Sequence, residues 1–328
     1  MLQGLLLLHQ STPMTHTILE TRSSKELFKL TDDGSGGWLQ TLKRRIKFGL
    51  RYRLSSNELL QIRSFFQEHG LSELSHTDLP VIFRSMRPYL WSGLSPTDRT
   101  EALLAHFEWL LTRYSADTVV DFYKCGSHTF FTQSHAECLI SLDVEPARGL
   151  GREGELAMHL KLDGVSVMRA AFSILPAKMV GIQSSGFVMV IGNMQGQRAL
   201  NHEIKIVTQK MERTRPQNIL MTALQGLASG WQLVGMVGVS DACHVYSSYR
   251  SLSKRVGLSY DKLWEELGSM GALSTTHWHL PVQWVPRSEQ DVPSNKRSQL
   301  RRKNEIRQKI FDEVARNCVP LRLSQAIY

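Results

Sequence analysis

The segment VSDACHVY, residues 239–246, brings together side chains that can move protons. They are the carboxylate of Asp241, the imidazole of His244 and the phenol of Tyr246, with the hydroxyl of Ser240 beside them. Groups of these types are sufficient for general acid–base catalysis when they converge on one substrate. We therefore take Asp241, His244 and Tyr246 as candidate catalytic residues. An ordinary polar loop at the end of a strand is the alternative interpretation.

Two arginines, Arg213 and Arg215, directly precede Pro216, and no charged residue follows until after Ser240. Proline suits the first turn of a helix, where its missing N–H costs no hydrogen bond. The first N–H groups of a helix have no partner within the helix and carry the positive end of its dipole. We therefore predict that Arg213 and Arg215 bind an anion such as phosphate. The alternative is that they solvate the surface end of a core helix.

The segment GNMQG, residues 192–196, is predicted to be a glycine-bearing turn at the end of the preceding strand. Ligands of α/β folds bind beside strand ends, so Gln195 and Gly196 are expected to line the same site. Neither a Walker pattern nor G-x-G-x-x-G is present. His277 and His279 lie on one face if THWH is extended, but two histidines without a third ligand do not make a metal site, so no metal is predicted.

The elements that must position these residues begin with a helical N-terminal part. Ser55 and Glu58 have the spacing of a capping box, and the helix that follows is expected to end at Gly70. A second helix is expected to begin at SPTD, with Ser95 as its N-cap. His106 falls beside the buried stripe of that helix, where we expect a structural donor rather than a catalytic group.

A change of pattern from about Val119 predicts a mostly antiparallel sheet. The Asp163–Gly164 pair is the strongest short hairpin signal. The β-rich runs are FYKCGSHTFF, ECLISLDV, GELAMHLKL, GVSVMRAAFSIL and GFVMVIGNMQ. Apolar residues then recur at helical spacing from Ile219 to Trp231, with Gly230 as the expected C-cap, before a buried strand at 233–239. The last strands and the helix between them form a strand–helix–strand crossover, most economically a parallel pair, so the fold class is α+β.

This organisation divides the chain into four predicted regions. Residues 1–24 are expected to be a disordered extension, 25–117 a mainly helical region, 118–292 the α+β core, and 293–328 a basic helix and tail. The leucine run near the start is too short to span a bilayer and lacks the features of an export signal, so translation from either Met1 or Met14 is open. We therefore expect a cytoplasmic protein, with a peripheral location at the inner membrane left open.

The net charge of +9 favours an anionic partner. Two strongly basic stretches, residues 43–53 and 296–309, could meet phosphates or an anionic membrane surface, or could be solvated faces. The first interleaves apolar residues with cations, whereas the second has only a thin apolar seam at Ile306 and Ile310. Nucleic acid is the less favoured partner because no recognised reading motif accompanies the charge.

Several motifs in this order and spacing resemble the VirK/YbjX family of Gram-negative bacterial proteins, from about Leu79 to Val314. They are IGNMQG, IKIVTQKMERTRP, GVSDACHVY, YDKLWEELGS, HLP and KRSQLRRKNEI, and SPTDRTEALLAHFEWL is similar to the family's N-terminal half. The chain departs from the family's pattern at Arg213 and Thr214, where a glycine is expected, and at Leu300, where a tyrosine is expected.

The resemblance implies an intracellular, virulence-associated protein that contributes to resistance to cationic antimicrobial peptides and to display of outer-membrane surface proteins. It supplies no catalytic residues. The order of elements is also similar to GNAT-type acyltransferases, in which a helix N-terminus holds the pyrophosphate of acyl-CoA, although their glycine-rich loop is missing here. In that reading acyl-CoA is the cofactor, Arg213 and Arg215 hold phosphate, and Tyr246 or His244 shuttles a proton. A non-catalytic membrane-surface module that assists protein localisation is the alternative, so whether the chain is an enzyme stays open.

Overall fold

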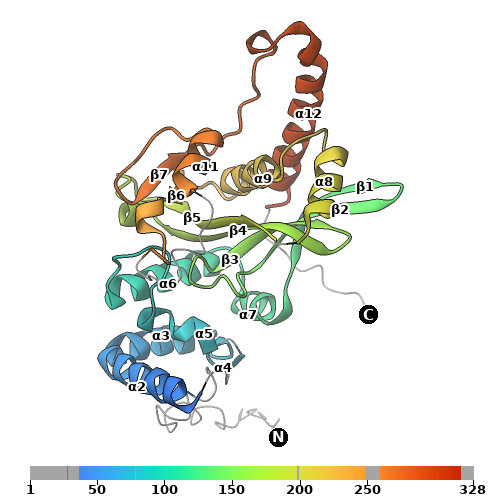
Figure 1. Ribbon diagram of the computed structural model, residues 1–328. Helices are drawn as coiled ribbons and strands as arrows, with labels where there is room; N and C mark the ends of the chain where they lie inside the picture. Colours follow the sequence, from blue (N-terminus) through green and yellow to red (C-terminus); the bar gives the residue numbers. More distant parts are fainter. Residues whose placement is uncertain (1–27, 29–36, 78, 198, 248–258, 319–328) are drawn as a thin grey trace, which may run out of the picture. The chain divides into compact units, whose positions relative to one another are not determined.

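A computed structural model describes residues 28, 37–77, 79–197, 199–247 and 259–318 (Figure 1). The predicted extension at residues 1–24 therefore lies outside the described part. The chain divides into two compact units, residues 1–56 and 57–328, and each unit is described by itself.

The first unit contains helix α2 (Trp38–Leu54), which follows Gly37 in extended conformation and ends at Ser55. Its buried side chain, Phe48, meets the ring of Phe28 at 5.7 Å and that of Tyr52 at 6.2 Å. The first basic stretch of the sequence thus forms one helix that packs through an aromatic side.

A series of helices precedes the sheet, and all of them except Ser56 of the first helix belong to the second unit. They are α3 (Ser56–Glu68), α4 (Leu74–Thr77), α5 (Leu79–Ile82), η1 (Arg84–Met86), α6 (Pro96–Leu111) and α7 (Ala116–Cys125). The end of α3 is as predicted, because Gly70 has φ +72° and the N–H of Leu71 bonds to the carbonyl of Phe66 at 2.7 Å. Ser95 caps α6 in a full capping box with Asp98, which confirms that helix start.

A seven-stranded sheet with strand order β1 to β7 forms the centre of this unit (Figure 1). The strands are β1 (His128–His135), β2 (Cys138–Pro146), β3 (Leu156–Leu162), β4 (Val165–Pro176), β5 (Phe187–Gly196), β6 (Gly235–Val239) and β7 (His277–Leu280). All neighbours are antiparallel except β5 and β6. Asp163 and Gly164, with φ +49° and +80°, make the predicted hairpin turn between β3 and β4. The predicted α+β class is confirmed.

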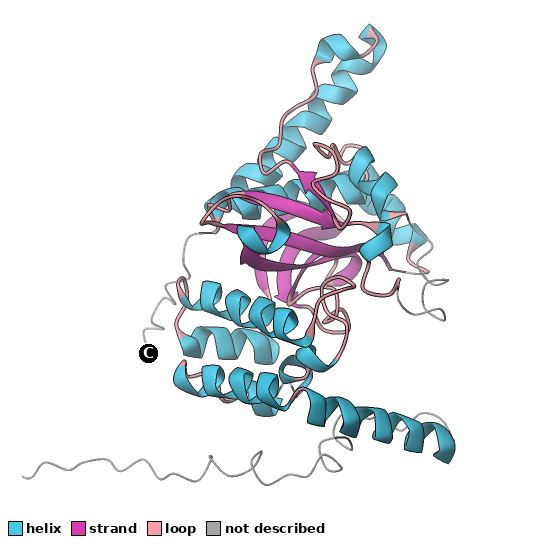
Figure 2. Cartoon of the chain, turned by 90° about the vertical axis from the view of Figure 1, so that its left-hand side faces the viewer, coloured by secondary structure: helices cyan, strands magenta, loops and turns pink. Residues whose placement is uncertain are grey.

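The crossover between β5 and β6 consists of two helices, α8 (Asn201–Lys210) and α9 (Pro216–Gly230), and it makes the predicted parallel pair. The remaining elements are η2 (Ala177–Val180), η3 (Asp241–Cys243), α11 (Tyr260–Glu266), η4 (Glu289–Asp291) and α12 (Ser294–Arg316). Figures 1 and 2 show α8, α9 and α12 on one side of the sheet and α6 and α7 on the other.

Gly230 is not the C-cap of α9, so that prediction was wrong. The helix ends with Gly230 still helical and Trp231 as C-cap, and Gln232 takes the left-handed conformation with φ +56°. A Cβ at Gly230 would lie 2.5 Å from the carbonyl oxygen of Ala315, and one at Gly226 would lie 2.9 Å from that of Phe311. These two glycines therefore form the surface on which the backbone of α12 packs.

The predicted turn at residues 192–196 is also wrong, because these residues continue β5 and pair with β4 as far as Gly196. The pairing register shifts there: Asn193 faces Ala171 and Ile191 faces Phe172, which leaves Gly192 as the extra residue of a β-bulge. A Cβ at Gly192 would lie 2.1 Å from the carbonyl oxygen of Glu153. The glycine thus serves a close backbone approach rather than a turn.

His106 is fully buried, as expected of a structural residue. Its Nδ1 accepts a hydrogen bond from the N–H of Ile174 at 3.1 Å, and its Nε2 lies 3.3 Å from the hydroxyl of Tyr123. Burial lowers the pKa of His106 to about 3, so the ring is neutral. His106 therefore accepts a hydrogen bond from the sheet backbone at Nδ1 and can donate one from Nε2.

Candidate functional site

The parallel strands β5 and β6 pair over only a short length. Residues 188–191 pair with 235–238, after which β6 ends at Val239 while β5 continues to Gly196 beside β4. The carboxyl ends of the two strands therefore separate. Such a break beside parallel strand ends is where open α/β sheets bind ligands.

A segment that precedes β3 crosses this region and carries Glu153. It packs closely on the sheet, since a Cβ at Gly154 would lie 2.4 Å from the backbone nitrogen of Phe172 and one at Gly192 would meet the carbonyl of Glu153. Two glycines, one on the segment and one in the bulge, thus allow the backbones to touch. The result places the Glu153 side chain against Asn193 of β5.

The side chain of Glu153 is buried, with 3% of its surface exposed. The side-chain amide of Asn193 donates to its Oε1 at 2.6 Å, and Nε2 of His244 lies 3.7 Å from the same oxygen. Burial raises the pKa of Glu153 to about 7, against the opposing effects of the Asn193 hydrogen bond and of Arg169 and Arg152. A carboxyl group with this pKa can accept and release a proton at neutral pH.

Glu155, a neighbouring acid, has different partners from Glu153. It is also buried, but the Nε of Arg84 lies 2.8 Å from its Oε1, and its backbone N–H bonds to the hydroxyl of Ser173 at 3.0 Å. Glu155 therefore forms a conventional ion pair that anchors the start of β3. Of the two acids, Glu153 is the one placed against an imidazole and an amide.

His244, a predicted catalytic residue, lies in this cluster with 3% of its surface exposed. Its ring stacks on that of Tyr260, with centroids 4.9 Å apart and planes at 9°. Its Nδ1 accepts from the N–H of Tyr246 at 3.4 Å, and its Nε2 lies 3.7 Å from the Oε1 of Glu153, longer than a hydrogen bond. Burial lowers the pKa of His244, so the neutral ring is the stable form.

Two tyrosines flank the imidazole in different surroundings. Tyr260 is buried, and burial together with the nearby Glu153 raises the pKa of its phenol. Tyr246, the second predicted catalytic residue, is half-buried, with its ring 5.6 Å from that of His244. The guanidinium of Arg152 lies 5.8 Å from the Tyr246 ring centroid. Tyr246 is thus the more accessible of the two phenols.

Asp241, the third predicted catalytic residue, is occupied by local hydrogen bonds. Its Oδ1 accepts from the N–H of Tyr260 at 2.6 Å and its Oδ2 from the hydroxyl of Ser259 at 2.7 Å. Its own N–H donates to Asp261 at 3.0 Å. This arrangement ties the end of β6 to the start of α11, and so positions Tyr260 under His244.

The start of α9 carries the predicted anion-binding residues. Arg215 is its N-cap and Pro216 its first residue; no side chain caps the helix and its first turn holds no acid. Arg213 and Arg215 are both exposed. Arg215 forms an ion pair with Glu266 at 3.4 Å, with both side chains mostly exposed. Such surface pairs contribute about 0–1 kcal/mol, so an anionic ligand can compete for the arginine.

Helix α11 connects the two groups of predicted residues. Tyr260 at its start contacts His244, and Glu266 at its end contacts Arg215. At 1.5 Å per residue these two positions are about 9 Å apart along the helix. Gln195 and Gly196, at the end of β5, form no hydrogen bond or ion pair with either arginine within the described part of the chain.

Sequence reasoning missed Glu153, Asn193 and Tyr260. Glu153 lies in GREGE, where two glycines around acidic residues were the available signal, and Asn193 lies inside a motif that was read as a turn. Their convergence depends on a chain crossing that no local pattern encodes. His277 and His279 fall on β7, where the ring of His277 packs on Trp91 at 4.6 Å. Among the described residues, no group of three His, Cys, Asp or Glu could hold a metal ion.

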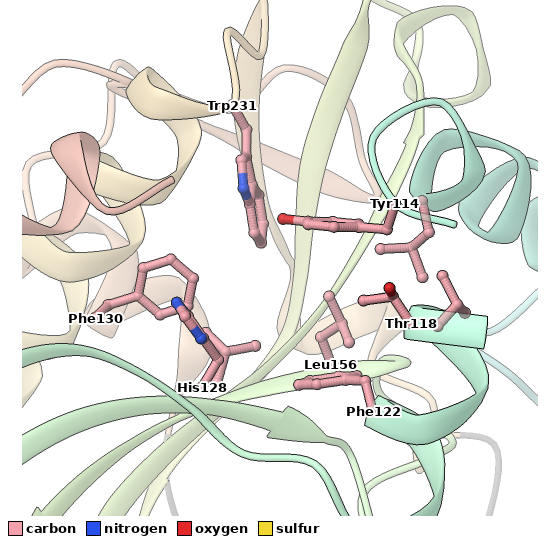
Figure 3. Close-up of a pocket in the computed structure, with 10 residues that line it drawn as sticks. Tyr114, Thr118, Phe122, His128, Phe130, Leu156 and Trp231 are labelled. Atoms are coloured by element: carbon pink, nitrogen blue, oxygen red, sulfur yellow. The ribbon is translucent and has the colours of Figure 1, made fainter. Parts of the chain in front are cut away.

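An apolar pocket lies apart from this cluster, and Figure 3 shows its aromatic walls. The hydroxyl end of Tyr114 points toward Trp231, while Phe130 and His128 lie together on another side and Phe122 lies beside Leu156. The full lining is Leu110, Tyr114, Thr118, Val119, Phe122, His128, Phe130, Val144, Leu156 and Trp231. Its cavity volume is about 60 Å³, which has room for a few water-sized groups rather than for a cofactor.

No helix within the described ranges is both long and apolar enough to cross a membrane.

Comparison with known proteins gives family and sequence matches. The family described as "Protein of unknown function (DUF535)" matches residues 37–317. The chain is 25% identical to "Uncharacterized protein YbjX" of Escherichia coli (strain K12) over 318 residues, which cover 93% of this chain and 94% of that protein. It is 27% identical to an "Uncharacterized protein" of Haemophilus influenzae over 121 residues, 36% of this chain and 40% of that protein. No solved structure matches the chain.

Proposed function

The chain belongs to the DUF535 family and to the VirK/YbjX group that its motifs indicate, and we propose that it is an acyltransferase with a phosphate-bearing acyl donor. The observation that carries the proposal is the separation of the parallel strands β5 and β6, with a buried carboxyl–imidazole pair at their ends. GNAT-type acyltransferases have a similar order of antiparallel strands, one parallel crossover pair and a donor at the crossover helix. This likeness of topology is support by analogy.

The start of α9 fits the phosphates of an acyl-CoA-type donor. Arg213 and Arg215 are exposed, the helix has no side-chain cap, and no acid in the first turn repels an anion. Backbone N–H groups at a helix start and arginine side chains are the usual partners of phosphate oxygens. A bound donor of this class supplies its acyl group as a thioester.

The residues at the strand ends carry out the proton transfers. The Glu153 carboxylate accepts the proton from an amine or hydroxyl of the acceptor as that group attacks the acyl carbon, and the Nε2–H of His244, 3.7 Å from its Oε1, helps to hold the carboxylate. The carbon–sulfur bond breaks as the new bond to the acceptor forms, and Tyr246 gives its hydroxyl proton to the leaving sulfur. Asn193 holds the Glu153 carboxyl group in position. Asp241 acts through α11, by fixing Tyr260 beneath the imidazole.

The biological role in this proposal is modification of a cell-envelope component inside a Gram-negative bacterium. It is the role that the VirK/YbjX resemblance implies, namely resistance to cationic antimicrobial peptides and display of outer-membrane surface proteins. An acyl group added to an envelope component changes how a cationic peptide meets the cell surface. The proposal places the protein on the cytoplasmic side, where acyl-CoA is available.

The first test is donor binding by thermal shift. The full chain is heated with CoA, acetyl-CoA and longer acyl-CoAs, and a saturating donor is expected to raise Tm by roughly 5 °C, since a ligand stabilises the state that binds it. The double variant Arg213→Ala, Arg215→Ala is expected to lose this rise. The matched control Lys296→Ala, Arg316→Ala removes two exposed charges from α12 and should keep it. An unchanged Tm with every donor, or equal loss in the control, rules the donor site out.

A second candidate function is a non-catalytic binding module that assists localisation of surface proteins. Its support is the burial of the carboxyl–imidazole pair, each residue being about 3% exposed. The variant Glu153→Gln separates the two functions. In an acyltransferase it keeps the thermal shift and loses turnover, whereas in a binding module it changes neither the shift nor the biological readout.

A further inference from the structure

Helix α2 (Trp38–Leu54) has an unusual charge distribution for a helix of its length. It is 17 residues long and contains no acidic residue. Its six cations are Lys43, Arg44, Arg45, Lys47, Arg51 and Arg53, and all except Arg44 are exposed. A helix with this composition attracts an anionic surface, because no carboxylate within it offsets the positive charge.

The same helix exposes large apolar side chains along one side. Leu42, Ile46 and Leu50 follow each other at intervals of four, with 43%, 63% and 58% of their surfaces exposed, and Trp38 is 74% exposed. Residues four apart lie on one face of a helix, so these side chains form a continuous row. Six of the twelve large hydrophobic side chains that are exposed in the described part of the chain belong to this one helix.

The side chains of α2 fall on three sides of the helix, which are a packed side, an apolar row and a row of cations. Phe48 is buried and packs through its ring on Phe28, so that side is occupied. At about 100° per residue, Leu42, Ile46 and Leu50 lie well away from Phe48 and Trp38 lies nearer to it. The cations Lys43, Lys47 and Arg51 form a second row along the border of the apolar row, and Arg53 lies within the apolar row in the last turn of the helix. Long basic side chains beside an apolar row can reach lipid phosphates while the apolar groups enter the acyl region.

We propose that α2 binds the surface of a bilayer that contains anionic lipids, with Trp38, Leu42, Ile46 and Leu50 inserted and the cations against the headgroups. The apolar row selects a lipid surface over nucleic acid, because a phosphate backbone offers nothing that would cover it. The helix lies in the plane of the surface, since its six charges prevent it from crossing the hydrocarbon core.

The second basic helix, α12, does not share these features. Arg301 forms an ion pair with Glu289 at 3.0 Å, and Arg302 forms one with Glu212 at 3.2 Å. None of the exposed large hydrophobic side chains lies in α12 within the described residues. The two basic stretches of the sequence are therefore separable, and α12 provides a matched control for charge.

The experiment is sedimentation of the full chain with vesicles at physiological salt. Wild type is expected to bind vesicles of phosphatidylcholine with 30% phosphatidylglycerol and to leave pure phosphatidylcholine vesicles unbound. The variant Lys43→Glu, Lys47→Glu, Arg51→Glu is expected to bind at least tenfold more weakly. Its control, Lys296→Glu, Arg297→Glu, Lys303→Glu, makes the same change of net charge in α12 and should bind within twofold of wild type.

The apolar row is tested separately with Leu42→Ser, Ile46→Ser, which keeps every charge. Binding is expected to fall at least tenfold, whereas Leu60→Ser, Val285→Ser, at exposed apolar positions outside α2, leaves it unchanged. Far-ultraviolet circular dichroism establishes that each variant is folded. Full vesicle binding by the serine variant overturns the proposal, as does equal loss in the α12 control. Self-association of wild type that Leu42→Ser, Ile46→Ser abolishes would identify a second copy of the chain as the occupant instead.

Discussion

Glu153 is the residue on which the proposed chemistry depends most. Its carboxyl group is buried against an amide and an imidazole, and its pKa is raised to about 7 mainly by the loss of water. Buried groups with such shifts are common at functional sites because they are costly to keep for stability alone. The raised pKa also makes the free energy of unfolding depend on pH, which can be measured without any substrate.

The pH dependence of stability should report this carboxyl group. Between its ordinary pKa of 4.5 and about 7, the folded chain holds a proton that the unfolded chain has released. The free energy of unfolding therefore falls as pH rises through this window. Relative to Glu153→Gln, which cannot titrate, wild type should lose on the order of 2–3 kcal/mol between pH 5 and pH 8. Urea unfolding of both proteins at the two pH values measures the difference.

The buried histidines do not confuse this comparison, because His106, His244 and His277 are present in both proteins. Their pKa values are lowered by burial, so they reduce stability only as pH falls below their ordinary value. A difference between wild type and Glu153→Gln that stays constant from pH 5 to pH 8 would show that Glu153 is charged throughout and not a base poised near neutrality.

At the scale of elements, the contact between α9 and α12 depends on Gly230. Alanine in place of glycine within a helix usually stabilises it by about 0.5–1 kcal/mol. Here the new Cβ would lie 2.5 Å from the carbonyl oxygen of Ala315 and 2.6 Å from the Cβ of Cys318. We expect Gly230→Ala to lower the free energy of unfolding by about 1–3 kcal/mol, as overpacking does.

Chemical denaturation of Gly230→Ala decides the sign. Ser229→Ala, at the neighbouring half-buried position, is the control for a change at the end of α9 and should alter stability by less than about 1 kcal/mol, the usual value of one hydrogen bond. Gly230→Ala as stable as wild type, or more so, would mean that α12 can move away from α9 without loss.

The elements that could be predicted from the sequence are those fixed by local chemistry. Ser95 with Asp98 makes a capping box, and Asp163 with Gly164 makes a hairpin turn, wherever the rest of the chain lies. The predictions for Gly192 and Gly230 were wrong because these glycines allow the backbones of distant segments, at Glu153 and Ala315, to approach closely. The sequence alone does not show whether a glycine is needed for a turn or for close packing against another segment.

Only part of the candidate site could be predicted from the sequence. The position of His244 after a buried strand followed from the pattern, and the structure places it beside Tyr246. Glu153 and Asn193 could not be recognised, because a crossing segment and a bulge bring them together. Asp241 was recognised by its type, but its hydrogen bonds to the start of α11 appear only in three dimensions.

At the scale of the molecule, the proposed site and α2 belong to different compact units, and each can be altered without the other. The net charge of +9 favours an anionic membrane in general, but six cations without an acid in α2 concentrate that attraction. An acyltransferase held at the inner surface of the membrane would act on lipid-linked acceptors at high local concentration. We therefore expect the variant at Glu153 and the charge-reversal variant in α2 to have different effects in cells.

Peptide resistance is the cellular readout. Loss of the gene is expected to lower the concentration of a cationic antimicrobial peptide that inhibits the bacterium, and wild type should restore it. Glu153→Gln should fail to restore it because turnover is lost, and Lys43→Glu, Lys47→Glu, Arg51→Glu should restore it only in part because the protein no longer concentrates at the membrane. Growth in a peptide dilution series measures each strain, with protein levels matched by immunoblot. Full restoration by Glu153→Gln would separate peptide resistance from the proposed chemistry.

The most direct measurement is the rate at which free thiol appears when the chain is mixed with an acyl-CoA and a lipid extract of a Gram-negative envelope. The rate is expected to rise as pH increases through about 7, where Glu153 loses its proton, and to level off above it. Glu153→Gln is expected to lower it at least 100-fold, the usual contribution of a general base being about 10²–10⁴. Thiol release by Glu153→Gln at the wild-type rate, or none from wild type with any acyl-CoA, would contradict the assignment.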